Sequence, residues 1–211
     1  MKTREPAFVS SASLAAELAE VFAVAKDMSI SVKNAKAIAN RAGTKARGFS
    51  PITDFIDEMS VETMKLVNRI NKESIELSRV AINDLKVQDS FNKFEQVMAV
   101  ASDAQYINSL QASMNRIKKE QTEEKNKLKK YSRALRDLMS DIAQHMAVAN
   151  VIVSNSRIEA VNADEYRANL ESIANDIEIS CDTIRDRVKS SQHRLENAMQ
   201  QWRRDFHHEG R

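Results

Sequence analysis

Hydrophobic residues recur along this 211-residue chain at alternating steps of four and three residues. This spacing is the heptad pattern shown by the buried face of a helix in a coiled coil. We call each row of residues with this spacing a seam. The first seam contains Leu14, Leu18, Val21, Ala25, Met28, Val32, Ala35 and Ala39. A second seam keeps one register from Ile52 to Ala101 and therefore predicts a single helix of about fifty residues.

The same pattern returns twice in the second half of the chain. A third seam runs from Ile107 to Ile152 and includes His145, and a fourth runs from Tyr166 to Phe206 and includes Cys181. Four amphipathic helices of this kind can bury their apolar faces only against one another. The pattern predicts an all-α fold.

Residues that break helices are rare and concentrated in one short stretch. Of three glycines and two prolines, Gly43, Gly48 and Pro51 lie close together between the first two seams. Gly43 stands where a left-handed C-terminal cap would fall, and Ser50-Pro51 supplies an N-cap and a proline for the first turn of the next helix. The spacing predicts a tight reversal over residues 43–50.

Two further reversals have no glycine. One is expected near Ser102-Asp103 and the other at 160–165. The predicted organisation is a flexible arm at 1–10, a first helical hairpin at 11–103 with its tip at 43–50, and a second hairpin at 104–207 with its tip at 160–165.

A weak internal repeat relates the two hairpins. Within the tip segment from Asn34 to Ser60, an ungapped shift of 121 residues aligns five identical residues, all in or beside a seam: Asn34 with Asn155, Ala39 with Ala160, Ala42 with Ala163, Ile52 with Ile173 and Ile56 with Ile177. The two inner helices would be nearly equal in length, which places both tips at the same end. We therefore expect one elongated antiparallel four-helix coiled-coil bundle formed by two fused helical hairpins. Its outer helices are shorter, so the end near residue 103 would be only two helices thick.

The first turn also resembles a known family. Asn34-Ala35, Arg41-Ala42-Gly43 and Arg47-Gly48-Phe49 are similar to the membrane-distal tip of the cytoplasmic signalling hairpin of bacterial chemoreceptors, the methyl-accepting chemotaxis proteins. In the second copy, Asn155 and Glu159 carry the resemblance. Ile38 stands where the family has a tip glutamate, and Glu159 supplies that acid in the second copy.

The resemblance implies a site and partners. In this family the tip binds a histidine kinase and its coupling protein. The resemblance therefore implies that the tip of this chain binds a chemosensory histidine kinase, a coupling protein or other chemoreceptors. The residues that would form this partner-binding tip are Asn34, Ile38, Arg41, Arg47, Phe49, Asn155 and Glu159. A structural interpretation of two of these residues stays open: Phe49 would fold under the hairpin, and Arg47 would bind helix-end carbonyls.

Composition narrows the other function classes. The chain has 32 basic and 30 acidic residues, a net charge of +2, so no global field favours nucleic acid. A single cysteine, Cys181, forms no intramolecular disulfide and fits a reducing, cytoplasmic location. No apolar run approaches the length of an integral membrane segment. The fused hairpins suggest a monomer or weak dimer.

Little in the sequence suggests catalysis. It has no glycine-rich phosphate loop, no nucleophile elbow and no Glu-x-x-His pair of the kind that di-iron bundles use. We expect no enzyme activity, no cofactor and no metal, and we interpret His145 as a buried neutral residue of the third seam.

One dense charge cluster extends from Arg116 to Arg136. The cluster can be explained as the solvent-exposed face of a helix. Alternatively, it is a membrane-binding patch of a peripheral membrane protein of the BAR type. Three hypotheses remain open: a non-enzymatic chemoreceptor-like signalling or scaffold module, a purely structural coiled coil, and a membrane-binding protein.

Overall fold

The computed structural model describes residues 7–100 and 109–207, which form four long helices and two short 3₁₀ turns. They follow in the order α1 (Ala7–Ala42), η1 (Gly43–Ala46), α2 (Phe49–Val100), α3 (Leu110–Val161), η3 (Asp164–Tyr166) and α4 (Arg167–His207). The predicted all-α fold is confirmed. The expected central turn near residue 103 lies outside the described residues.

The helix α1 begins earlier than the sequence suggested. Residues up to 10 were expected to form an arm, but the helix starts at Ala7 and includes Ser10, Ser11 and Ser13. Serine is only a moderately poor helix former, so serines can occupy the first turns when the helix behind them packs well.

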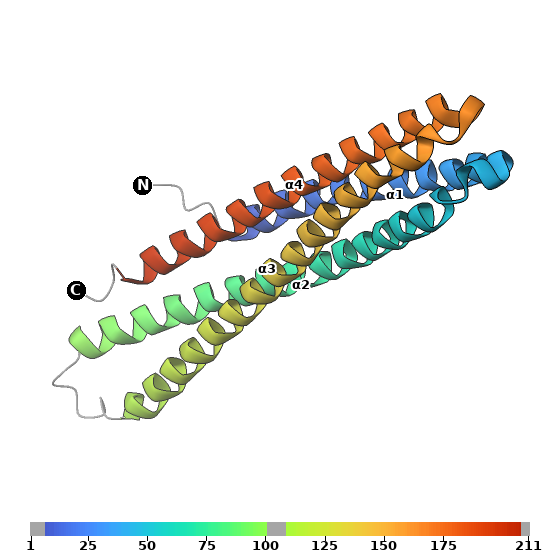
Figure 1. The fold of residues 1–211 in the computed structure, drawn as a ribbon. Coiled ribbons are helices and arrows are strands. Elements are labelled where there is room, and N and C mark those ends of the chain that lie inside the picture. The colour runs from blue at the N-terminus through green and yellow to red at the C-terminus, as the bar shows by residue number, and fades with distance from the viewer. Residues whose placement is uncertain (1–6, 101–108, 208–211) are drawn as a thin grey trace.

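The helices form an elongated bundle in which sequence neighbours are antiparallel (Figure 1). α1 packs against α2 and α4, and α3 packs against the same two helices. Both tips lie at one end (Figure 1). α2 and α3 each have 52 residues, a length of about 78 Å, whereas α1 and α4 have 36 and 41.

These lengths leave the end opposite the tips two helices thick, as expected (Figure 1). Trp202, near the end of α4, donates a hydrogen bond to Asp84 of α2 at 3.0 Å. Beyond this contact α2 is covered mainly by α3, and Phe91, Phe94 and Met98 are only half-buried. The pair formed by α2 and α3 therefore continues past the four-helix section without a second apolar layer.

The predicted seam of α1 is confirmed, because all eight of its residues are buried. On α2 the prediction is only half right. Ile56, Thr63 and Ile70 are buried as expected, but Met59 and Glu73 are half-buried, and the next residues along the chain, Ser60 and Ser74, are buried instead.

The serines at these positions are small enough for neighbouring helices to approach closely. Ser60 donates its hydroxyl proton to the carbonyl of Ile56 at 2.7 Å, so its polar group is satisfied within its own helix. Because α2 packs against both α1 and α3, its buried face is wider than one seam and also includes Ser60 and Ser74.

The same displacement corrects the prediction for His145. Met146 is fully buried, and His145 lies beside it as a half-buried residue rather than as a member of the core. On α4, Ala174 is likewise buried while Ile173 is half-buried. Most of the predicted seam residues of these helices are buried, and at a few positions the residue that follows the seam is buried in place of the seam residue.

The internal repeat is seen most clearly in which positions are buried. Each buried seam residue of α1 corresponds to a buried residue of α3 that lies 121 positions later in the chain. The first such pair is Leu14 and Leu135, and the last is Ala39 and Ala160. The correspondence continues from α2 to α4 through Ile56 and Ile177. The two hairpins are thus equivalent in register, although few of their residues are identical.

Candidate functional site: the paired hairpin tips

The first tip is built around a left-handed glycine. Gly43 has a φ of 62° and follows the end of α1, as predicted, and one 3₁₀ turn then leads through Arg47 and Gly48 to Phe49. A left-handed conformation is strained for residues with a Cβ atom, which explains why glycine stands at this point. Pro51 lies in the first turn of α2, where its missing N–H needs no partner.

The second tip makes the equivalent turn without glycine. Asp164, which is 121 residues after Gly43, also has a positive φ of 45°. Aspartate tolerates this region better than most residues. Backbone hydrogen bonds from Ala163 to Ala160 at 3.1 Å and from Tyr166 to Ala163 at 3.0 Å close the turn.

The two tips share a small hydrophobic core. The first tip contributes Phe49 with Ala35, Ala39 and Ala46, and the second contributes Ala160, Ala163 and Leu170. Alanines around one large ring allow the two hairpins to approach closely. The paired tips therefore form one compact structure rather than two separate loops.

Phe49 is the centre of this core, with 2% of its surface exposed. Its burial agrees with the structural interpretation, in which the ring folds under the hairpin, and leaves little of it for a partner to contact. Leu170, its equivalent in the second hairpin, is also buried. Phe49 is the first residue of α2, so its side chain turns under the tip as the chain reverses.

Gly48 is in close contact with Glu159 of the other hairpin. A Cβ atom at Gly48 would lie 2.5 Å from Cδ of Glu159 and 3.1 Å from its Cγ. Only a residue without a side chain leaves this space to the glutamate. Glu159 is consequently half-buried between the tips.

An ion pair also joins the tips at their outer edge. Nζ of Lys45 lies 2.5 Å from Oδ2 of Asp164, and both side chains are mostly exposed. The hydrogen bond from Lys45 to Asp164, together with the charge of that carboxylate, raises the pKa of Lys45. Such an exposed pair contributes little stability, but it orients the two turns relative to each other.

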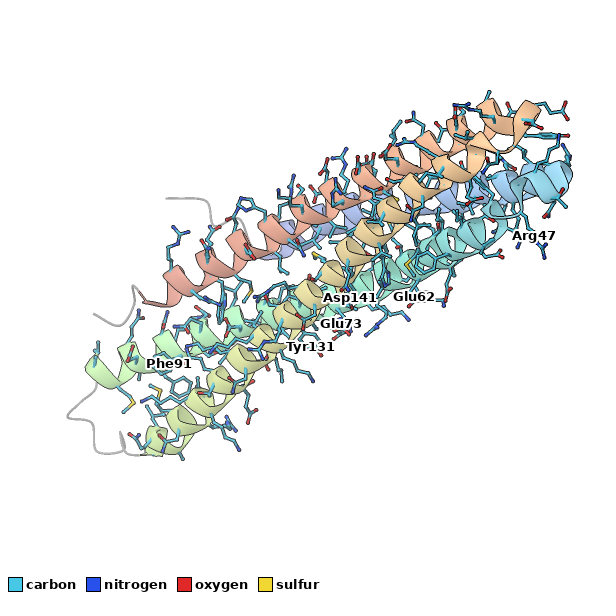
Figure 2. All side chains as sticks on the ribbon, viewed as in Figure 1. Arg47, Glu62, Glu73, Phe91, Tyr131 and Asp141 are labelled. Atoms are coloured by element: carbon cyan, nitrogen blue, oxygen red, sulfur yellow. The ribbon has the colours of Figure 1, made fainter. Side chains whose placement is uncertain are left out.

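The predicted site residues occupy three environments. Asn34, Arg41, Arg47 and Asn155 are exposed, and Arg47 projects away from the end of the bundle (Figure 2). Ile38 and Glu159 are half-buried, and Ile38 packs against the tip core. With Phe49 buried, the surface that a partner could touch carries the two arginines and the two asparagines.

An apolar stripe on α3 escaped the sequence analysis. Val148, Val151, Ile158 and Val161 are exposed on the outer side of this helix near the second tip, with Ile158 67% and Val151 63% exposed. The heptad spacing of Val151 and Ile158 could have revealed a second seam. At the equivalent positions α1 carries Asp27, Ile30, Ala37 and Asn40, so the stripe belongs to one hairpin only.

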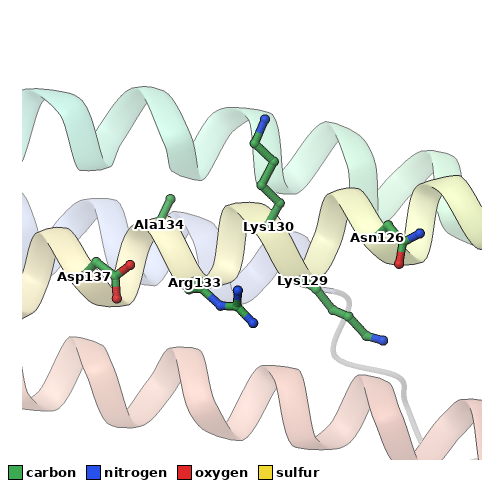
Figure 3. A pocket seen from close by; sticks show the side chains of 6 residues that line it. All are labelled: Asn126, Lys129, Lys130, Arg133, Ala134 and Asp137. Atoms are coloured by element: carbon green, nitrogen blue, oxygen red, sulfur yellow. The ribbon is translucent and has the colours of Figure 1, made fainter.

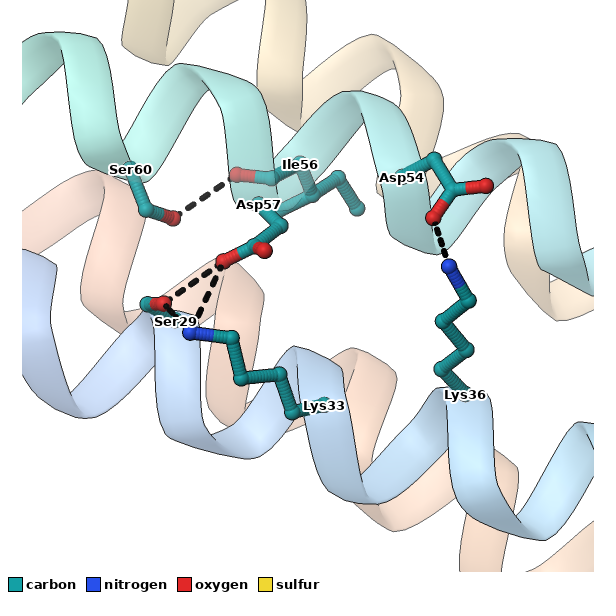
Figure 4. Close-up of polar contacts among 7 residues, drawn as sticks. All are labelled: Ser29, Lys33, Lys36, Asp54, Ile56, Asp57 and Ser60. Atoms are coloured by element: carbon teal, nitrogen blue, oxygen red, sulfur yellow. Dashed lines mark hydrogen bonds and ion pairs between the residues drawn. The ribbon is translucent and has the colours of Figure 1, made fainter.

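Polar contacts fix each hairpin below its tip. Ser29 donates a hydrogen bond to Asp57 at 2.6 Å, Lys33 lies 3.7 Å from the same carboxylate, and Lys36 pairs with Asp54 (Figure 4). In the second hairpin Arg157 takes the position of Lys36 and contacts Asn175 and Glu178. Each tip therefore rests on a helix pair that is joined by polar side chains.

Other candidate sites offer less chemistry. Burial raises the pKa of Cys181 to about 12, and its sulfur lies 3.7 Å from that of Met28, so its thiol is held in the unreactive form. His145 has a buried Nδ1 atom without a hydrogen-bond partner. Over residues 7–100 and 109–207, no three His, Cys, Asp or Glu side chains are grouped as metal ligands.

Within the part of the chain that the structure describes, no helix has both the length and the apolar character needed to cross a membrane.

Comparison with known proteins adds no relative to this picture. No protein-family model matches the chain, and neither a curated protein nor a solved structure matches it.

Proposed function

We propose that this protein is a non-enzymatic signalling or scaffold module that binds a chemosensory histidine kinase, its coupling protein or a chemoreceptor through its paired tips. The observation that carries the proposal is the asymmetric tip surface. The first turn presents the exposed Arg41 and Arg47, and α3 carries an exposed apolar stripe near the second turn. The sequence resemblance of both tips to the chemoreceptor hairpin gives the class of partner.

The architecture supports this role because it presents the tip as a preorganised surface. The shared core around Phe49 and the close contact of Gly48 with Glu159 hold both turns in one arrangement. A partner would then lose little entropy in ordering the surface that it binds. Aliphatic side chains could fill pockets of the partner, and the exposed arginines could pair with its carboxylates.

A purely structural coiled coil is the competing function. Such a bundle needs its apolar residues in the core and gains nothing from large exposed ones. Contiguous exposed apolar residues usually mark an interaction surface. The stripe from Val148 to Val161 lies beside the tip, where the binding function requires it.

Binding to purified partners tests the proposal. Immobilised wild-type protein should retain the histidine kinase or coupling protein of the source cell, and Ile158→Asp should lose that binding while keeping its melting temperature. Ile75→Asp is the matched control, because Ile75 is 55% exposed on α2 and lies far from the tips. If the wild type retains neither protein, or if both variants bind equally well, the proposed function fails.

A further inference from the structure

Positive charge is concentrated in one segment of α3. Residues 125–136 contain six basic residues and no acidic residue, in a chain whose net charge is +2: Lys125, Lys127, Lys129, Lys130, Arg133 and Arg136. A local charge of this size attracts polyanions although the protein as a whole is nearly neutral.

Most of these charges are not neutralised by the protein. Lys127 pairs with Glu124 at 2.7 Å, whereas Lys129, Lys130, Arg133 and Arg136 are exposed and form no ion pair with any residue of 7–100 or 109–207. Figure 3 shows Lys130 on the side of α2 and both Lys129 and Arg133 on the side of α4. They cover the outer width of α3 along a shallow groove that also contains Asn126 and Asp137.

The end of α4 adds two more cations. Trp202 donates to the carboxylate of Asp84, and Lys125 lies near enough to that carboxylate to influence its pKa. Arg203 and Arg204, which come directly after Trp202 in the chain, are exposed and have no ion-pair partner among the described residues. We call Lys129, Lys130, Arg133 and Arg136 the basic surface.

Exposed aliphatic residues lie at the two-helix end, beyond the basic surface. Val97 is half exposed, and Val100 is 89% exposed at the end of α2. Basic residues combined with exposed aliphatic ones are typical of protein surfaces that lie in the interface of an anionic membrane. Binding of nucleic acid would use the cations but would leave the valines without a role.

We propose that the basic surface and the two-helix end dock on a membrane that contains anionic lipids. The cations contact lipid phosphates and carboxylates, and Val97 and Val100 enter the apolar edge of the headgroup layer. The bundle then lies along the membrane at this end, and its tips, at the opposite end, remain accessible. The inference does not depend on the proposed function of the tips.

Vesicle sedimentation tests it with the whole chain. The probes are vesicles of phosphatidylcholine alone and vesicles that also contain phosphatidylserine. The wild type should sediment only with the anionic vesicles and should be released by high salt. The triple variant Lys129→Glu, Lys130→Glu, Arg133→Glu should lower the partition coefficient on the order of 100-fold.

The matched control reverses three exposed charges elsewhere, Lys26→Glu, Arg69→Glu and Lys189→Glu, and so has the same net charge. It should bind anionic vesicles within about threefold of the wild type, since it keeps the basic surface. Val100→Asp tests the apolar contact without touching the core and should weaken binding severalfold. Circular dichroism would establish that every variant is folded.

Three results would overturn the proposal. The first is that the wild type does not sediment with anionic vesicles. The second is that the α3 variant and the control bind these vesicles equally well. In the third case, a short DNA or RNA duplex binds the wild type more tightly than the vesicles do, and the α3 variant loses that binding, which would assign the surface to nucleic acid.

Discussion

Gly43 and Asp164 lie 121 residues apart, and both turn the chain with a left-handed backbone, at φ of 62° and 45°. They are the corresponding residues of the two hairpins, since the same shift also superimposes the buried positions of the flanking helices. One turn uses the residue for which this conformation is unstrained, whereas the other accepts an aspartate that Lys45 contacts from the opposite tip.

The first prediction concerns this turn. Gly43→Ala should lower the free energy of unfolding by about 1–2 kcal/mol, because alanine is strained in the left-handed region. A Cβ atom at this position would meet no other atom within 4 Å, so the loss is a backbone effect alone. Urea denaturation followed by circular dichroism would measure it. An alanine variant as stable as the wild type would contradict the assigned backbone conformation.

The second prediction concerns the contact between Gly48 and Glu159. Gly48→Ala should displace the glutamate and lower stability, by about 1 kcal/mol, because the added methyl group overlaps its side chain. In the background of Glu159→Ala the same substitution should have less effect, because the obstructing side chain is gone. A double-mutant cycle measures this coupling, and additive effects would show that the two residues do not touch.

The third prediction separates the two interpretations of Phe49. Because its side chain is buried between the tips, Phe49→Ala should cost about 3–5 kcal/mol of stability. Leu170→Ala at the equivalent position should cost about 2–5 kcal/mol. Arg47→Ala, at an exposed neighbour, is the control and should change stability by less than about 0.5 kcal/mol. If Phe49→Ala melts like the wild type, the ring is not part of a core.

The fourth prediction concerns pH. Burial raises the pKa of Asp84; the hydrogen bond from Trp202 and the charge of Lys125 oppose this shift, and Glu124 adds to it. The native state therefore holds this proton more tightly than the unfolded chain does. As the pH rises from about 4 through the native pKa, the free energy of unfolding should decrease, because ionised Asp84 is disfavoured in its buried site.

Asp84→Asn should remove this dependence, since the amide oxygen can still accept the hydrogen bond from Trp202 while carrying no charge. At pH 8 we expect the variant to be more stable than the wild type by on the order of 1 kcal/mol. Thermal unfolding at several pH values would measure the difference. The exposed Asp89, which pairs with Lys93 at 2.6 Å, supplies the control for removing a carboxylate: Asp89→Asn should not stabilise the protein at pH 8.

The seam of α1, the single long helix α2 and the left-handed turn at Gly43 could be predicted from the sequence alone. Each depends on local information: the heptad step sets the helix, and glycine is the residue that takes a positive φ without strain. The shift of 121 residues likewise predicted that both tips lie at one end, because equal inner helices return the chain to the same level.

Only the tertiary structure decided which row of residues is buried and what surrounds the tips. Met59 belongs to the predicted seam of α2, but in the bundle it is half-buried and the next residue, Ser60, is buried instead. Phe49 could equally have been exposed at a turn, and it is buried because a second hairpin supplies the alanines that enclose it. Glu159 meets Gly48 across 111 residues of chain, a contact that no local pattern encodes.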